Sequence, residues 1–262
     1  MQVKVNNREY ISGLLGKGTR ETTRGFSDYR KIGLTLGALP QAEGSAMADM
    51  GDTKVLAGVK LGVGTPLQDK PGEGTLITST ELLPMASPRY ETGPPSPDAI
   101  EFARVVDRGI RAANIIDTKA LFIEEDKVWN VFVDIYVLNY DGNLFDAGTL
   151  AAMSAILTAK QPRFEDGAAI RDNGLSRIKT NGKIVTSCTF GKLDGHVLLD
   201  PDGNEEDMMS SRVTIANDEG AIRAMQKGLR GAFSVEEVEK AIDVTFERSK
   251  ELRSIVKKVI GE

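Results

Sequence analysis

Cysteine and histidine are almost missing from the chain, because Cys188 and His196 are the only residues of their types. One cysteine cannot form a disulfide within the chain, and one residue of each type cannot complete a structural zinc site. Both residues flank one predicted hairpin, so a catalytic Cys–His pair is possible on paper. Cys188 lies in an apolar strand, however, where a free cysteine usually just packs. The sequence therefore favours packing, and a serine triad with His196 as its base ranks lower still.

Long hydrophobic runs and an excess of basic residues are missing too. No apolar run approaches the roughly 18 residues that a membrane helix needs, and the N-terminus has no signal-peptide core. We therefore expect a cytoplasmic protein that contacts no membrane. The formal net charge of the 262-residue chain is −5, whereas a protein that coats nucleic acid non-specifically is usually basic. Any contact with RNA must therefore use a local basic patch.

The first half of the chain contains two segments with the alternation of β-strands and one helical segment rich in small residues. Residues 52–63 alternate apolar and other side chains with a period of two. Residues 128–138 are largely apolar on both faces, which predicts a strand covered on both sides. Residues 146–159 are crowded with alanine, which predicts a tightly packed central helix.

The second half begins with a hairpin and ends with a long helix. Residues 162–182 combine proline and glycine with charges and are the best candidate boundary between two halves. Asp194-Gly195, between two apolar runs, predicts a type I′ turn, and further strands are predicted at 212–216 and 221–227. Ser234 is the predicted N-cap of the last helix, with Glu237 at the capping-box position. The charged end of this helix, residues 248–258, is predicted to be solvated.

Strands followed by a long helix in each half predict a mixed α+β (α/β) fold. We expect two similar units side by side, residues 1–162 and 163–262. No Walker A or dinucleotide-binding motif is present, and we expect no cofactor.

A row of arginines marks the helix that Ser96-Pro97-Asp98 opens. Arg104, Arg108 and Arg111 are spaced i, i+4 and i+7, on the side away from the apolar face. Three guanidinium groups in one row can bind successive phosphates of a single strand. The alternative is a solvated helix face, because Asp107 with Arg111 and Glu101 with Arg104 are spaced for ion pairs. Spacing alone leaves both interpretations open.

Several motifs together resemble the RNase PH family. Their order and spacing are most similar to the non-catalytic RNase PH-like subunit of the archaeal exosome, and the resemblance runs over nearly the whole chain. The motifs are Gly-Ser-Ala at 44–46, Gly-Asp-Thr-Lys-Val-Leu-Ala-Gly-Val at 51–59, Arg-Val-Val-Asp-Arg-Gly-Ile-Arg at 104–111, Trp-Asn-Val-Phe-Val-Asp-Ile-Tyr-Val at 129–137 and Asp-Gly-Asn-Leu at 141–144.

The resemblance implies a fold, partners and a substrate. Family members fold as two βαβα-type units, related to the ribosomal protein S5 domain 2-like fold. The archaeal ring is a hexamer, a trimer of heterodimers that each pair one catalytic and one non-catalytic subunit, with RNA-binding cap subunits on one face. It degrades single-stranded RNA from the 3′ end with inorganic phosphate. The arginine-bearing helix lies near the partner's active site, so Arg104 and Arg108 are the main predicted RNA-binding residues, and Arg111 is a weaker one.

Departures from the family pattern predict a subunit without catalytic residues. Active relatives carry Asp-Gly-Gly-Thr-Arg after the central strand, where Leu144 and Phe145 replace the phosphate-binding donors here. Active relatives also carry an acidic pair and, about six residues further on, a second aspartate. That aspartate is missing here, because residues 210–217 contain no carboxylate and Arg212 lies near its expected place. The segment 22–25 reads Thr-Thr-Arg-Gly where relatives often have Asp-Gly-Arg, which leaves the roles of Arg20 and Arg24 open.

Three consecutive acids, Glu205, Glu206 and Asp207, allow other hypotheses. They could form a loop for Mg²⁺ or Ca²⁺, although solvated turn acids are the favoured interpretation, and we predict no metal site. The main alternative function is a catalytically active, homohexameric phosphorolytic nuclease with Asp207 as a displaced acid. A third is an unrelated oligomeric metabolic enzyme that uses residues 205–207 for a metal.

Overall fold

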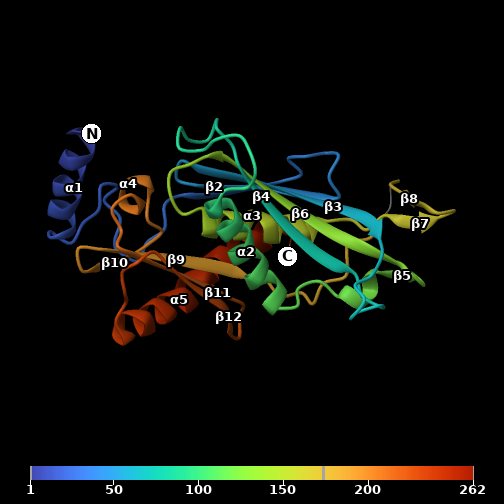
Figure 1. Cartoon of the computed structure of the whole chain (residues 1–262). Coiled ribbons are helices and arrows are strands. Elements are labelled where there is room, and N and C mark those ends of the chain that lie inside the picture. The colour runs from blue at the N-terminus through green and yellow to red at the C-terminus, as the bar shows by residue number, and fades with distance from the viewer. Residues whose placement is uncertain (1, 173–174, 262) are drawn as a thin grey trace.

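The computed structural model describes residues 2–172 and 175–261, and Figure 1 shows its elements along the chain. The first half contains α1 (Gln2–Leu15), β1 (Ile32–Leu36), β2 (Gly44–Met50), β3 (Thr53–Gly64), β4 (Thr75–Leu82), α2 (Pro97–Ala112), the 3₁₀ helix η1 (Thr118–Leu121), β5 (Phe122–Glu124), β6 (Lys127–Asn139) and α3 (Leu144–Thr158). The second half contains β7 (Arg163–Glu165), β8 (Ala168–Ile170), β9 (Thr186–Leu193), β10 (His196–Leu199), α4 (Gly203–Glu206), β11 (Ser211–Asn217), β12 (Ile222–Gly228) and α5 (Val235–Ile260). The predicted mixed fold is confirmed. Among the described residues, no helix is long and apolar enough to cross a membrane.

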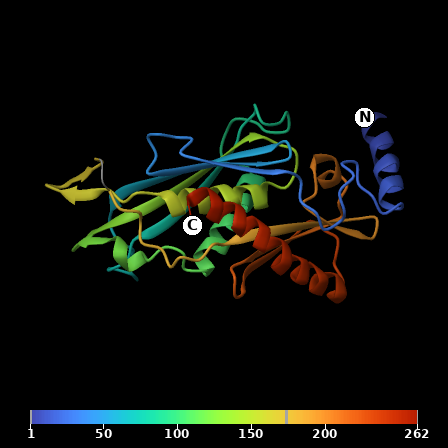
Figure 2. The ribbon, with the colours of Figure 1, turned by 180° about the vertical axis from the view of Figure 1, so that it is seen from behind.

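Two sheets and the helix between them organise the chain. The larger sheet has the strand order β1-β2-β3-β6-β4, with β5 paired to β6, and the smaller one has the order β10-β9-β11-β12. Strand β4 runs parallel to β6, and α2 connects them on the way, which is a βαβ crossover. The long helix α5 covers the smaller sheet and also contacts α3 (Figure 2). The hairpin β7–β8 and the helix α1 lie at opposite ends of the molecule (Figure 1).

Helix α3 is the predicted central helix, and it is buried from Leu144 to Leu157. It packs on β2 and β3 of the larger sheet and on β9 of the smaller one. Its small side chains permit this close approach, and Gly44 on β2 completes it. A Cβ atom at Gly44 would clash with the carbonyl oxygen of Ala155 and would lie 2.7 Å from the Cα atom of Ala159. The helix begins two residues earlier than predicted, because Asn143 rather than a later residue is its N-cap.

The predicted strand at 128–138 is confirmed as part of β6, but the prediction that both of its faces are covered is wrong. Side chains that alternate from Trp129 to Val137 are at most 2% exposed and face α3. On the opposite face Phe132 is half-buried and Tyr136 is 38% exposed. In this chain α3 covers one face of the sheet only, so apolar residues on both faces of a strand do not require cover on both faces within one chain.

The turn of the β9–β10 hairpin and the first turn of α5 agree with the predictions. Asp194 and Gly195 both have positive φ, 44° and 84°, as a type I′ turn requires. Ser234 and Glu237 form the predicted capping box of α5. The prediction of a solvated end at 248–258 is wrong. Leu252 and Val256 are buried there, because the helical period of apolar residues continues beneath the charged ones.

Candidate functional site

The arginine row lies on the exposed face of α2. Ser96 caps the helix by accepting a hydrogen bond from the backbone N–H of Ala99, and Pro97 occupies the first turn. Apolar residues from Ala99 to Ile110 face the interior, so the helix is anchored along one side. Arg104, Arg108 and Arg111 remain exposed on the other side.

The structure brings all three predicted arginines to one groove. This groove has a volume of about 590 Å³ and runs between α2 and strand β4. Leu76, Ile77 and Thr78 of β4 form its second wall. The three cations therefore line one continuous surface rather than three separate ones.

The three arginines differ in how much of their hydrogen-bonding capacity is already used. Arg111 donates to the carboxylate of Asp107, at 2.8 and 2.9 Å, and to the carbonyl oxygen of Leu76 at 2.7 Å. Arg108 donates only to the neutral side chain of Gln226, at 2.9 Å. Within residues 2–172 and 175–261, Arg104 has no hydrogen-bond or ion-pair partner. Arg104 and Arg108 are thus the cations that can still meet an anion.

One of the two ion pairs expected on this helix forms and the other does not. Asp107 pairs with Arg111 as the spacing predicts. The predicted pair of Glu101 with Arg104 is wrong, because Glu101 instead binds Arg212 of β11 at 2.6 Å. Arg212 approaches from a different element and is largely buried, so it takes this carboxylate and leaves Arg104 free to face the groove.

The turn after β6 is filled with hydrocarbon where the family pattern has phosphate-binding donors. Leu144 and Phe145 are only 9% and 6% exposed. The ring of Phe145 meets that of Phe102 edge to face at 5.8 Å, and the guanidinium of Arg212 lies 4.2 Å from its centre. An apolar side chain offers no donor to an oxyanion, so this turn cannot hold phosphate with residues 144 and 145.

The acids 205–207 are each engaged by a named group, and the prediction of solvated turn acids is wrong for the first two. Glu205 is buried and binds Arg20, with 2.8 Å between Nε and Oε1. Glu206 accepts from the hydroxyl of Tyr140 at 2.6 Å and from the backbone N–H of Asn143 at 2.8 Å. Burial raises the pKa of Glu206.

Asp207 is the acid of this trio that is nearest to solvent, and it binds Arg89 at 2.9 Å. Among the described residues, no group of three or more histidine, cysteine or acidic side chains is placed to hold a metal ion. Glu205 and Glu206 connect α4 to Arg20 and to the turn between β6 and α3.

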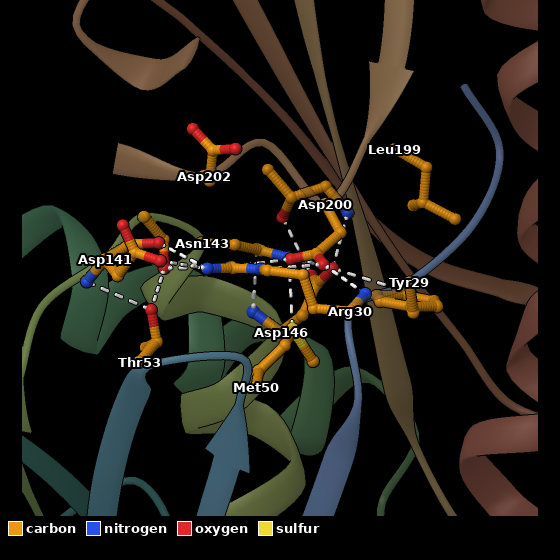
Figure 3. A network of polar contacts seen from close by, with 12 residues as sticks. Tyr29, Arg30, Met50, Thr53, Asp141, Asn143, Asp146, Leu199, Asp200 and Asp202 are labelled. Atoms are coloured by element: carbon orange, nitrogen blue, oxygen red, sulfur yellow. Dashed lines mark hydrogen bonds and ion pairs between the residues drawn. The ribbon is translucent and has the colours of Figure 1, made fainter. Parts of the chain in front are cut away.

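Arg20 and Arg24, whose roles the sequence left open, belong to a buried polar network between the two halves. Arg24 binds Asp200 at 2.7 Å, and Asp200 also binds Arg30 at 2.8 Å. The amide of Asn143 donates to Asp200 at 2.8 Å. Figure 3 shows how Arg30, Asn143 and Asp200 converge from segments that are far apart in the sequence.

Asp146, at the start of α3, extends this network into the smaller sheet. Its carboxylate accepts from the amide of Asn143, from the hydroxyl of Tyr29, and from the backbone N–H and hydroxyl of Thr189, all at 2.8–3.0 Å. Burial raises the pKa of Asp146 to about 6, against the effect of these donors. Sequence analysis missed Arg30, Asp146 and Asp200, because most of their partners lie more than forty residues away.

The single cysteine and histidine do not form a pair. Cys188 is fully buried beneath α5, with Ser249 at 3.6 Å, and burial raises the pKa of its thiol to about 12. The ring of His196 packs against that of Phe26 at 5.3 Å. The expectation that Cys188 packs as a small hydrophobic residue is confirmed.

Comparison with known proteins places the chain in a family. Residues 28–162 match domain 1 of the 3′ exoribonuclease family, RNase PH, and residues 183–248 match its domain 2. The protein called exosome complex component Rrp42 of Thermococcus gammatolerans is 42% identical over 97% of this chain and 95% of its own length. The Pyrococcus furiosus protein of the same name is 41% identical over 95% of this chain and 92% of its own.

Solved structures give the same result. A chain of the Archaeoglobus fulgidus exosome with RNA bound to the active site superposes with a TM-score of 0.89 and 37% identity, over 97% of this chain and 99% of that one. A chain of an archaeal exosome core superposes with a TM-score of 0.87 and 34% identity, over 97% and 98%. The sequence motifs, the fold and these matches agree, and the chain belongs to the RNase PH family of 3′ exoribonuclease proteins, with the exosome components called Rrp42 among its relatives.

Proposed function

We propose that this chain is a non-catalytic, RNA-binding and structural subunit of an exosome, a ring that degrades RNA from the 3′ end with inorganic phosphate. In this ring it pairs with a catalytic RNase PH-like subunit, three such pairs form the hexamer, and RNA-binding cap subunits dock on one face. The proposal rests on relatives that are named as exosome components and on a similar chain in an exosome with RNA bound.

The observation that carries the non-catalytic role is the packing around Phe145. Leu144 and Phe145 fill the turn that would need phosphate donors, and Arg212 is fixed between Phe145 and Glu101. Arg212 lies near the position where active relatives carry a catalytic aspartate. At that position this chain therefore has a positive group in place of a negative one. Changing only one of Leu144, Phe145 and Arg212 to the residue of active relatives would leave the other two altered.

The proposed contribution to the active site comes from the groove beside α2. Arg104 and Arg108 are exposed, lie one helical turn apart and keep most of their donors free. Guanidinium groups in such a row suit the phosphates of a single strand that enters the active site of the partner. Arg111 contributes less, because Asp107 and the carbonyl oxygen of Leu76 occupy it.

The decisive experiment is a phosphorolysis assay on the purified chain, on its catalytic partner and on their reconstituted complex. We expect the chain alone to release no nucleoside diphosphate from single-stranded RNA in phosphate buffer, and the complex to release it. Release by the chain alone would overturn the proposal and favour an active homohexamer. In that case Asp207→Asn would abolish the activity if Asp207 were the displaced acid.

A further inference from the structure

A second basic groove lies along the last turns of α5, away from the arginine row. It has a volume of about 720 Å³ and is lined by Glu219, Lys250, Arg253, Ser254, Lys257 and Lys258. Four cations and one carboxylate therefore surround it, in a chain whose net charge is −5. Helix α2 passes in front of α5 in Figure 1, and α5 is in front when the molecule is seen from behind in Figure 2. The two grooves share no lining residue.

The floor of this groove contains a buried guanidinium with little to bind. Arg253 is only 5% exposed. Its one hydrogen bond in the described part of the chain is a long one, 3.5 Å from Nη1 to the hydroxyl of Thr186. A guanidinium carries five N–H donors, and a buried charge without a partner is costly. Burial lowers the pKa of Arg253 by more than the charges of Glu219 and Asp218, at longer range, raise it.

The nearby carboxylates are already bound to other cations. Asp218 binds Arg223 and Lys183 and accepts from two backbone N–H groups. Glu219 binds Lys257 at 2.8 Å. Neither carboxylate lies within ion-pair distance of Arg253. An external anion would therefore balance the charge of its guanidinium group.

The rim of the groove supplies further unoccupied donors. Lys250 and Lys258 are exposed, and neither has an ion-pair partner among the described residues. Residues 250, 254 and 257 follow one face of α5, and the cations from Lys250 to Lys258 span roughly 12 Å at 1.5 Å per residue. A fork of donors at the floor and ammonium groups at the rim suit a tetrahedral oxyanion. The volume is in the range of small-ligand sites, which is enough for a nucleotide unit.

We propose that this groove is a phosphate-binding site, in which Arg253 binds a phosphate oxygen and Lys250 and Lys258 hold the same or the adjoining phosphate. The phosphate belongs to the backbone of single-stranded RNA or is free in solution. The proposal does not depend on the role of Arg104 and Arg108, because the groove is on a different helix and shares no residue with theirs.

The test uses the full chain with Arg104 and Arg108 both replaced by alanine, so that the groove beside α2 loses the two arginines proposed to bind RNA most strongly. Binding of a single-stranded RNA oligonucleotide is titrated over a salt series for this background and for the same protein with Lys250→Ala and Lys258→Ala. Each lost phosphate contact makes the slope of log K against log salt less steep by about 0.7 for single strands, so we expect a change of about 0.7 if the two lysines hold one phosphate and of about 1.4 if they hold two. Lys240→Ala is the matched control, because Lys240 is exposed on the same helix but outside the groove.

A second arm measures thermal stability with inorganic phosphate against chloride at equal ionic strength. We expect phosphate to raise the melting temperature, and Arg253→Met to remove the effect. Arg253 is buried, so this variant can be less stable, and the Lys250/Lys258 variant tests the site without that complication. An RNA response alone or a phosphate response alone each supports the site and identifies the source of the phosphate. Unchanged salt slopes together with no effect of phosphate would overturn it, as would binding of polyglutamate but of neither phosphate compound.

Discussion

Arg104 and Arg111 lie on one helix face and yet differ in what they can do. Arg111 is held by a carboxylate and a carbonyl oxygen, whereas Arg104 is free and Arg108 has only a neutral partner. A bound side chain must give up its contacts before it can bind a phosphate, and a free one need not. The capacity of a basic residue to bind RNA therefore depends on its neighbours as much as on its charge.

Replacing Arg104 and Arg108 by alanine should weaken RNA binding by the assembled ring and flatten its dependence on salt. The loss of two phosphate contacts of about 0.7 each would make the slope of log K against log salt less steep by about 1.4. Arg111→Ala is the matched comparison, since it removes the same charge from the same groove, and it should change the slope less. The measurement is the affinity of each ring for RNA from low to high salt. Equal slopes for the double variant and the unaltered ring would refute this role.

At the scale of elements, the contact of β2 with α3 depends on a residue without a side chain. Gly44→Ala should lower the free energy of unfolding by about 1–3 kcal/mol, the range for overpacking in a core. The added methyl group meets backbone atoms of Ala155 and Ala159, which cannot turn aside as a flexible side chain would. Urea unfolding measures the change.

Gly13 in α1 provides the control for this substitution, because a Cβ atom there meets nothing within 4 Å. Gly13→Ala should leave stability unchanged or raise it by up to about 1 kcal/mol, since alanine favours a helix over glycine. A Gly44 variant as stable as the Gly13 variant would show that β2 and α3 can separate without cost.

The same elements show what could be predicted from the sequence. Strands β3 and β6, the β9–β10 turn and the start of α5 were predictable, because alternation, Asp-Gly turns and capping boxes are local signals. The buried end of α5 was predictable too, since Leu252, Val256 and Ile260 keep helical spacing, but the density of charge suggested a solvated helix.

Contacts between distant segments were not predictable from local pattern. Helix α1 was not foreseen, and its buried residues Ile11 and Leu15 pack with Leu193 and Leu198 of the hairpin. Glu205 was expected to be solvated because its partner Arg20 lies 185 residues away. The arginine row was predicted from spacing, but which of its members stays free depends on β4, β11 and β12, and only the folded chain shows this.

At the scale of the whole molecule, buried charges join the two halves. Asp200, beyond β10, binds Arg24 from the segment before β1. It also binds Arg30 from that segment and the amide of Asn143 at the start of α3 (Figure 3). Breaking a buried pair by removing one partner leaves an uncompensated charge, which costs about 3–5 kcal/mol.

Asp146 makes this joint sensitive to pH. The pKa of its carboxyl is about 6 in the folded chain, above the ordinary value of 3.8. Between these values the folded state holds a proton that the unfolded state has released, so stability from this group is full below about pH 4 and is lost as pH rises through 6. In Asp146→Asn that titration is absent. An amide can occupy the same position, with its oxygen accepting from Tyr29, Asn143 and the Thr189 backbone and its NH₂ donating to the Thr189 hydroxyl.

The stability of the unaltered protein relative to Asp146→Asn should therefore fall as pH rises from 4.5 to 7.5. The full shift corresponds to about 3 kcal/mol at 1.36 kcal/mol per pKa unit, and about 2 kcal/mol of it is lost between pH 4.5 and 7.5. Urea unfolding of both proteins at several pH values gives this difference directly, and all other titrating groups are common to the two chains and cancel to first order. A difference that stays constant over this range would mean that Asp146 is ionised in the folded state throughout. The four donors around its carboxylate would then outweigh its burial, and the joint between the halves would be held by charge at every pH tested.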